Sequence, residues 1–196
     1  MNVLIVAAAK FEITSIKIKQ NPILITGVGM VNTAINLTKE LIKKKYDLVI
    51  NMGVAGSFSE ELKNGDVVEV VEDNFSEIGF ENGFEFSKFT DFDLKTKFYN
   101  SAKTALKQVK AITVNTVHGK NDTIFEITKR ENPEIESMEG ASVFKVCEEF
   151  NVPCVQIRSV SNKVEKRNRN NWDLDLAIRN LNIEVEKIIG NLWNSH

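Results

Sequence analysis

Apolar and polar positions form two kinds of block along this chain, and each kind predicts an element. Short apolar runs rich in β-branched residues and bounded by Gly, Pro, Asn or Asp are typical of buried strands. Such runs occupy residues 3–9, 23–28, 47–52, 66–71, 111–117 and 152–160. Apolar residues repeating every three or four positions predict helices at about 31–45, 94–107, 124–130, 139–150 and 172–192. The Phe-, Gly- and Glu-rich stretch 74–93 fits neither pattern.

Strands and helices therefore alternate along the chain. This order predicts a single α/β domain over residues 1–196, with a twisted, mostly parallel central sheet flanked by helices. No repeat or linker-like stretch divides the chain, and its length allows one sizeable core.

Composition narrows the classes of partner. The chain is 42% hydrophobic and 27% charged with a net charge of −2, so nothing suggests a nucleic-acid-binding face. No apolar stretch reaches the ~18 residues that span a bilayer, and the N-terminus fits a first strand better than a signal peptide. We expect a cytoplasmic protein with no membrane partner.

Cys147 and Cys154 lie in apolar contexts typical of buried thiols. His118 and His196 are too few for a His-based metal site, and we expect neither a metal nor a cofactor.

Polar residues follow two of the predicted strands. Ligands of open α/β sheets bind beyond the carboxyl ends of strands. Ser161 and Asn162 end the apolar run 152–160, and Glu12 follows the first run. These residues are candidates for substrate contact. The alternatives are that Ser161 and Asn162 cap the following helix, and that Glu12 is a solvated acid.

Two glycine-containing segments follow strands. The segment 27–32 (GVGMVN) half-matches the dinucleotide fingerprint, but Asn32 replaces its third glycine. A tight turn whose free N–H groups face a ligand is the simpler interpretation. In the segment 51–58 (NMGVAGSF), Gly53 and Ala55 would let a ligand approach the backbone, and a plain turn is about equally supported.

Two carboxylates flank a methionine in the segment 136–141 (ESMEGA), just before a predicted helix. The two oxygens of Glu139 could accept hydrogen bonds from a vicinal diol, with Met138 as an adaptable apolar surface beneath the sugar. Alternatively, Glu139 merely favours the helix macrodipole.

Together these segments resemble the nucleoside phosphorylase and nucleosidase superfamily. The matching pieces, in the order of that family, are Glu12, GVGMVNTA at 27–34, NMGVAGSF at 51–58, GDVVEV at 65–70, ESMEGAS at 136–142 and RSVSN at 158–162. The stretch 158–172 is most similar to futalosine hydrolases, which release hypoxanthine from futalosine in one route to menaquinone. The related methylthioadenosine and adenosylhomocysteine nucleosidases carry Asp where this chain has Asn162. The chain departs from the family in its short stretch between Glu12 and Ile23, and in Ser137, where many relatives have Glu.

The resemblance implies a homodimer or larger homo-oligomer and assigns roles to individual residues. Glu12 would activate water, Met138 and Glu139 would contact ribose, and Asn162 would contact the base. Phe125 falls near the base-binding segment of the family. The implied activity is hydrolysis of the N-glycosidic bond of a purine nucleoside, most specifically futalosine. A methylthioadenosine/adenosylhomocysteine or aminofutalosine nucleosidase is the alternative, and a non-catalytic nucleoside-binding protein is a further one.

The residues themselves agree with hydrolysis. Cleaving a ribosyl C–N bond passes through an oxocarbenium-like state, and Glu12 can take the proton from water. A carboxylate at that position would repel the phosphate dianion of a phosphorylase. The amide of Asn162 has two donors and no acidic proton, which suits N7 and O6 of a 6-oxopurine.

Two surface features suggest further contacts. Arg167 and Arg169 belong to a basic run that could meet an anionic 5′ substituent, or could be a solvated face. The segment with Phe75, Phe80, Phe84, Phe86 and Phe89 could form a patch covered by a partner subunit, or could fill the core of its own chain.

Overall fold

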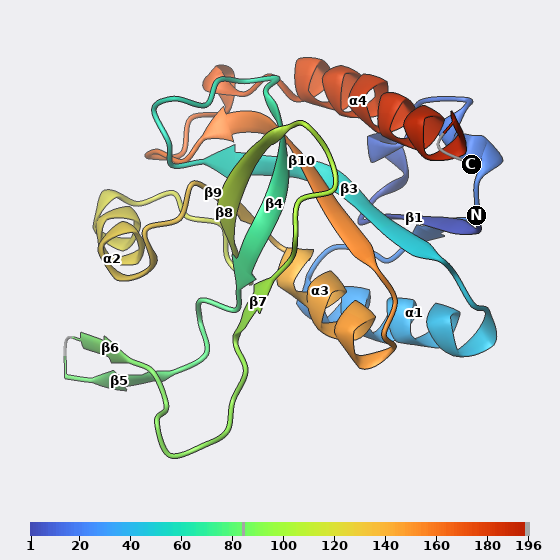
Figure 1. Ribbon diagram of the computed structural model, residues 1–196. Coiled ribbons are helices and arrows are strands. Elements are labelled where there is room, and N and C mark those ends of the chain that lie inside the picture. Colours follow the sequence, from blue (N-terminus) through green and yellow to red (C-terminus); the bar gives the residue numbers. More distant parts are fainter. Residues whose placement is uncertain (84, 195–196) are drawn as a thin grey trace.

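A mixed β-sheet forms the centre of the protein (Figure 1). The computed structural model describes residues 1–83 and 85–194. The strands of the main sheet are β1 (Val3–Ala7), β2 (Ile23–Ile25), β3 (Leu48–Ser57), β4 (Val67–Asn74), β7 (Lys97–Tyr99), β8 (Lys107–Thr113), β9 (Ile135–Ser137) and β10 (Cys154–Lys163). Five of the pairings are parallel and three, β4–β10, β3–β9 and β4–β7, are antiparallel. The expected α/β fold is confirmed, with a sheet that mixes both directions.

Strand β3 is a central strand of this sheet and pairs with three others. It pairs with β10 on one side and with β1 and β9 on the other, so that β3, β10, β4, β8 and β9 close into a ring. The prediction that Gly53 and Ala55 follow the strand is wrong, because β3 continues to Ser57 and pairs them with Arg158 and Val160 of β10. The carboxyl ends of β3 and β10, Ser57 and Lys163, therefore lie side by side.

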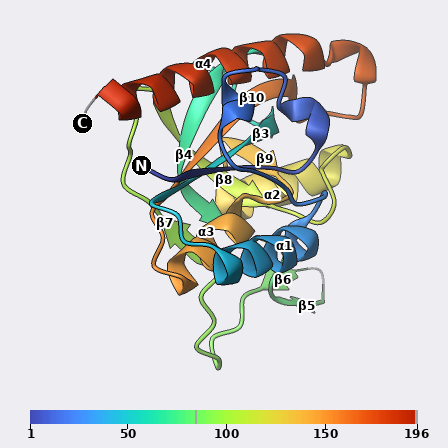
Figure 2. The ribbon, with the colours of Figure 1, turned by 90° about the vertical axis from the view of Figure 1, so that its right-hand side faces the viewer.

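Helices cover both faces of the sheet (Figures 1 and 2). On one face, α1 (Met30–Lys43) and α3 (Gly140–Glu149) bury apolar side chains such as Leu37 and Phe144. On the other face, α4 (Leu174–Asn194) buries Leu181, Val185 and Ile189 against β1, β3 and β10. The short helix α2 (Asn121–Glu131) lies beside β8 and β9, where Ile127 packs with Ile112 and Val114. None of the described helices is long and apolar enough to cross a bilayer.

The short stretch 13–22 contains no long helix. It follows the single turn η1 (Lys10–Glu12) and contains a second, η2 (Ile18–Gln20). Ile13 and Ile18 are buried in the same apolar cluster as the α4 side chains. The segment after Glu12 is therefore anchored on α4.

The hairpin of β5 (Phe80–Asn82) and β6 (Glu85–Ser87) stands out from the body of the protein (Figure 1). The ring of Phe89 lies 5.3 Å from that of Phe80 and 5.4 Å from that of Phe92 between centroids. Phe80, Phe89 and Phe92 are nevertheless 44%, 39% and 65% exposed. Phe75 instead packs edge-on against Phe98 in the body. Phe84 and His196 lie outside the described residues. The Phe-rich segment is therefore divided between the core and an exposed cluster.

The helix predicted at 94–107 is wrong. Residues 97–99 instead form β7, which pairs with β4, and Phe98 is buried at 3% exposure. The loop that follows is held by Glu69, whose carboxylate accepts hydrogen bonds from the backbone N–H groups of Lys103 and Thr104. Tertiary partners for an edge strand and a buried acid outweigh the weak local preference for helix.

Candidate active site

Glu12 lies at the end of η1, and only 5% of it is exposed. Its Oε2 accepts a hydrogen bond from the Ala9 N–H at 2.9 Å, and its Oε1 accepts one from the Val54 N–H at 3.3 Å. Burial raises the pKa of Glu12, while these hydrogen bonds and the positive charge of Arg158 act in the opposite direction. A carboxylate with a raised pKa is a better proton acceptor near neutral pH. The position and environment of Glu12 suit a general base.

Arg158 lies beside Glu12 in the middle of β10 and is 1% exposed. Its Nη2 donates to Asn51 Oδ1 at 2.7 Å and to Gln156 Oε1 at 3.1 Å. A Cβ atom on Gly53 would lie 2.3 Å from Arg158 Nη1 and 2.9 Å from Glu12 Oε1. The space beside Gly53 thus holds two side chains of the protein.

Glu139 immediately precedes α3 and is 7% exposed. Its Oε1 accepts a hydrogen bond from the Gly29 N–H at 3.0 Å, and its Oε2 lies 3.9 Å from Arg158 Nη1. Gly29 has a φ of 95°, a conformation that favours glycine. The free N–H of the 27–29 turn therefore orients Glu139. Met138, which is half-buried, lies between the end of β9 and Glu139.

A third buried acid, Asp73, extends this polar network, and it is not among the site residues predicted from the sequence. Its carboxylate accepts hydrogen bonds from Thr113 Oγ1 and Gln156 Nε2, both at 2.9 Å. Burial raises the pKa of Asp73 to about 7. Gln156 also contacts Arg158, so a chain of polar contacts connects Asp73 to the Glu12 end of the site. The place of Asp73 shortly after the apolar run 66–71 was the available signal.

Ser161 and Asn162 lie within β10, at a bulge in its pairing with β3. Ser161 Oγ is 2.8 Å from Asn162 Oδ1 and 3.2 Å from the carbonyl oxygen of Ala55. Asn162 Nδ2 donates to the Lys163 carbonyl at 2.9 Å. Neither side chain caps α4, because Asp173 Oδ1 accepts the Leu176 N–H at that helix start. The capping alternative is therefore excluded.

Asn162 lines a cavity of about 50 Å³ together with His118, Glu136, Arg167 and Trp172. His118 and Arg167 also line a neighbouring cavity of about 400 Å³. His118 is not among the substrate contacts predicted from the sequence. Its place just after the predicted strand 111–117 was the signal that it faces the ligand side of the sheet.

The other predicted contacts are placed less centrally. Phe125 is 65% exposed on α2, and the contacts described above do not involve it. The guanidinium groups of Arg167 and Arg169 lie 5.2 and 5.7 Å from the Trp172 ring centroid. Lys163, from the same basic run, pairs with Glu60. Of this basic run, Lys163 and Arg167 both line the cavity at Asn162.

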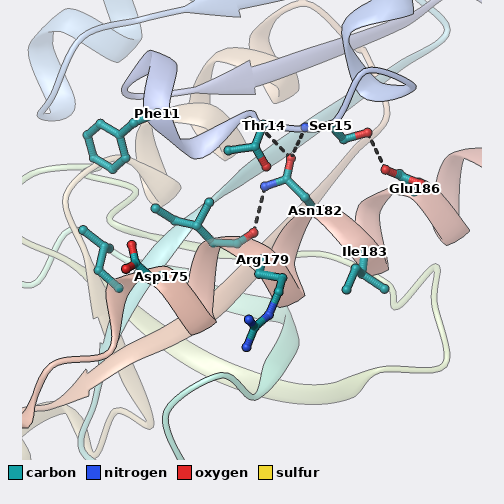
Figure 3. Close-up of a pocket in the computed structure, with 10 residues that line it drawn as sticks. Phe11, Thr14, Ser15, Asp175, Arg179, Asn182, Ile183 and Glu186 are labelled. Carbon is teal, nitrogen blue, oxygen red and sulfur yellow. Dashed lines mark hydrogen bonds between the residues drawn. The ribbon is translucent and has the colours of Figure 1, made fainter.

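A larger hollow of about 610 Å³ lies between α4 and the segment after Glu12 (Figure 3). Asn182 of α4 closes its inner wall, and its Oδ1 accepts hydrogen bonds from the N–H groups of Thr14 and Ser15 at 2.9 and 3.0 Å. Its Nδ2 donates to the Glu12 carbonyl at 2.9 Å. Asn182 thus holds the turn that presents Glu12.

The charged groups of the site do not gather as metal ligands. Within residues 1–83 and 85–194, no group of three or more His, Cys, Asp or Glu side chains is arranged to hold a metal ion. Cys147 and Cys154 are buried and unpaired.

Comparisons with known proteins identify the family. Residues 4–192 match the phosphorylase superfamily. The chain is 29% identical to the 5′-methylthioadenosine/S-adenosylhomocysteine nucleosidase of Psychromonas ingrahamii, over 98% of this chain and 90% of that protein. It is 34% identical to the protein of the same name from Shewanella frigidimarina, over 80% and 74% of the two chains. The expectation of an enzyme in the nucleosidase class is confirmed by these relatives.

Solved structures agree on the fold. An MTAN mutant of Helicobacter pylori with 5′-methylthioadenosine in the active site superimposes with a TM-score of 0.84 at 18% identity, over 97% and 98% of the chains. The futalosine hydrolase of Helicobacter pylori superimposes with a TM-score of 0.83 at 17% identity, over 96% and 97%. The protein described here belongs to the phosphorylase superfamily.

Proposed function

We propose that this protein hydrolyses the N-glycosidic bond of a purine nucleoside. The observation that carries the proposal is the buried cluster of Glu12, Glu139 and Arg158 where β1, β3, β10 and the start of α3 meet. In the proposed reaction Glu12 takes a proton from water as the water attacks C1′ of the ribose. Glu139 accepts hydrogen bonds from the ribose hydroxyls, and Met138 packs beneath the sugar.

The charges of the cluster favour water over phosphate as the nucleophile. Two carboxylates, those of Glu12 and Glu139, lie beside the guanidinium of Arg158. The donors of Arg158 already bond Asn51 and Gln156. A phosphate dianion would meet uncompensated negative charge in a buried place, whereas the positive charge that develops on the ribose is stabilised there.

We make two proposals for the purine base of the substrate, and we put 6-aminopurine nucleosides first. The sequence relatives bear the name 5′-methylthioadenosine/S-adenosylhomocysteine nucleosidase, and they support this substrate class better than futalosine. The second proposal is a 6-oxopurine nucleoside such as futalosine. It rests on Asn162, whose amide has two donors for N7 and O6, and a futalosine hydrolase is among the structural neighbours.

Binding the base requires the rim of the site to open. A cavity of about 50 Å³ at Asn162 has room for a water molecule but not for a purine. The Arg167 N–H donates to the Gly119 carbonyl at 3.2 Å and joins the two loops that bound this cavity. Parting them would merge the small cavity with the neighbouring one of about 400 Å³.

A substrate panel tests the proposal. Purified protein would be incubated with methylthioadenosine, adenosylhomocysteine, aminofutalosine, futalosine and inosine, with chromatography for free base. We expect adenine from the first three. Because futalosine and aminofutalosine differ only at the purine 6 position, preference for futalosine would instead support the role of Asn162. Binding without release of any base would overturn hydrolysis and leave a nucleoside-binding protein.

The variant Asn162→Asp sharpens the comparison of the bases. A protonated Asp can transfer an acidic proton to N7 and accept from the 6-amino group, whereas the amide of Asn has no acidic proton to transfer. The variant should shift the ratio of kcat/KM toward aminofutalosine. An unchanged ratio would show that Asn162 does not read the base.

A homodimer or larger assembly, in which a neighbour completes the mouth of the site, is a further part of this proposal. The exposed cluster of Phe80, Phe89 and Phe92 on the β5–β6 arm supports it, because apolar surface of this kind is typical of interfaces. Light scattering at micromolar concentration measures the mass directly. A monomeric mass would contradict the assembly.

A further inference from the structure

We infer that His118, held by the buried carboxylate of Glu136, is the general acid that protonates the departing purine. This inference rests on the proposed nucleosidase function and adds a residue to its chemistry. The geometry that carries it is a two-point contact between His118 and Glu136, beside Asn162.

Glu136 fixes the orientation of the His118 ring. Its Oε1 accepts the His118 backbone N–H at 3.0 Å, and its Oε2 lies 2.6 Å from His118 Nδ1. Glu136 is 3% exposed, and the ring of Phe58 packs edge-on against the imidazole with centroids 6.0 Å apart. With Nδ1 bound to a carboxylate, Nε2 is the ring nitrogen that remains for proton transfer in the cavity.

This pair and Asn162 form one row across the sheet. Gly56 of β3 is paired with Glu136 of β9 on one side and with Asn162 of β10 on the other. A Cβ atom on Gly56 would lie 3.3 Å from Asn162 Nδ2 and 3.6 Å from Glu136 Cγ. Asn162 and His118 also line the same cavity. A base that contacts the Asn162 amide is therefore within the reach of His118.

The chemistry of the other lining groups leaves this role to His118. A purine leaves poorly as an anion, and an amide such as Asn162 has no acidic proton to give it. At neutral pH lysine and arginine side chains ordinarily retain their protons and carboxylic acids have already lost theirs, whereas imidazole exchanges a proton there. The charged residues that line the two cavities besides His118 and Glu136 are Glu77, Lys120, Lys163, Glu165 and Arg167.

The proposed step balances in protons and electrons. The electron pair of the C1′–N9 bond moves into the purine ring as that bond breaks, and the ring takes the proton from Nε2 of the His118 imidazolium. Water forms the new C1′–O bond and transfers a proton to Glu12. The enzyme thus loses one proton at His118 and gains one at Glu12, and exchange with solvent restores both groups.

The main test is the variant His118→Asn, because the Asn amide can still donate to Glu136 from near the position of Nδ1. On the best substrate of the panel, we expect kcat to fall about 100-fold, a typical value for a general acid, with KM within about threefold. Because a general acid must be protonated to act, kcat/KM of wild type should fall at high pH, and this alkaline limb should be absent from the variant. A fall of less than tenfold, or a surviving limb, would overturn the role.

A second substrate separates chemistry from damage to the fold. The 4-nitrophenolate of 4-nitrophenyl β-D-riboside leaves without protonation, so its hydrolysis should change less than threefold in His118→Asn. Equal losses on the riboside and the purine nucleoside would mean a structural role. If wild type does not hydrolyse the riboside, two measurements on the purine nucleoside distinguish a general acid from a structural role. They are the loss of kcat at nearly constant KM and the absence of the alkaline limb. If wild type releases no base from any nucleoside, the proposed function fails first, which is a distinct result.

Two further variants complete the test. Glu136→Gln keeps a carbonyl acceptor near His118, so it should lower kcat about tenfold while the alkaline limb persists, as expected for a positioning residue. His118→Gln places an amide nitrogen near the position of Nε2 without an acidic proton, and it should match His118→Asn in kcat. Thermal melting of each variant shows whether it folds. Full kcat in a folded His118→Gln protein would exclude proton donation.

Discussion

The ribose end and the base end of the proposed site are built from different kinds of structure. Glu12 and Glu139 are 5% and 7% exposed, and backbone N–H groups and Arg158 hold them in the interior. Asn162 instead lies near the end of β10, at a bulge, and His118 lies in the loop after β8. A residue at the ribose end can be substituted only if its buried neighbours also change. The base end faces cavities bounded by loops, where substitutions that alter base preference are tolerated more easily.

The largest effect expected at the ribose end is loss of turnover in Glu12→Gln. The amide keeps the shape of the side chain but cannot accept the proton from water, so kcat should fall ~10²–10⁴-fold with little change in substrate binding. Steady-state kinetics and equilibrium binding measure the two quantities. The matched control is Glu149→Gln, which changes an exposed acid of α3 and should leave kcat and substrate binding unchanged. Near-wild-type hydrolysis by folded Glu12→Gln would remove the general base from the proposal.

Gly53→Ala tests how closely the buried end is packed. The new Cβ would lie within 2.9 Å of both the Arg158 and Glu12 side chains, so unfolding free energy should fall by about 3 kcal/mol, and kcat should fall as well. Urea denaturation measures the change. Gly190→Ala is the control, since nothing lies within 4 Å of its added Cβ and alanine favours the interior of α4. Equal stability of the two variants would contradict the packing argument.

The buried network should also make stability depend on pH through Asp73. Its folded pKa, raised by burial to about 7, exceeds its ordinary value of 3.8. The stabilisation is therefore complete below the ordinary value and is lost as pH rises toward 7. Relative to Asp73→Asn, wild type should lose on the order of 2 kcal/mol between pH 5 and pH 8. Urea denaturation at both pH values checks this, and a constant difference between the two proteins would contradict it.

The smallest effects are expected at the rim, in Arg167→Met and Arg169→Met. Exposed charges contribute little individually, so each should change kcat/KM by no more than about fivefold. If the rim meets an anionic 5′ substituent, Arg167→Met should weaken hydrolysis of futalosine but not of inosine. Arg169→Met is the matched control, because Arg167 lines the cavities at Asn162. Equal losses on both nucleosides would remove the carboxylate argument.

Periodicity predicted most elements because burial of one face of a helix or strand produces a regular spacing of apolar residues in the local sequence. The helices α1, α3 and α4 and the strands β1, β4 and β10 lie within a few residues of their predicted ranges. The prediction of a helix at 94–107 was wrong because the partners that fix its conformation, β4 and the Glu69 carboxylate, are distant in sequence. Likewise, only the pairing with β10 places Gly53 inside a strand.

For the candidate site, the sequence by itself determined the residue types at the ends of strands. It placed Glu12, Glu139 and Asn162 in segments that resemble one superfamily, and the family match agrees. Tertiary structure decided which of them meet. The close approach of β3 and β10 brings Arg158 beside Glu12, and pairing on both sides of Gly56 brings His118 and Glu136 to Asn162. Strand register and close packing are long-range properties, so no local pattern contains them.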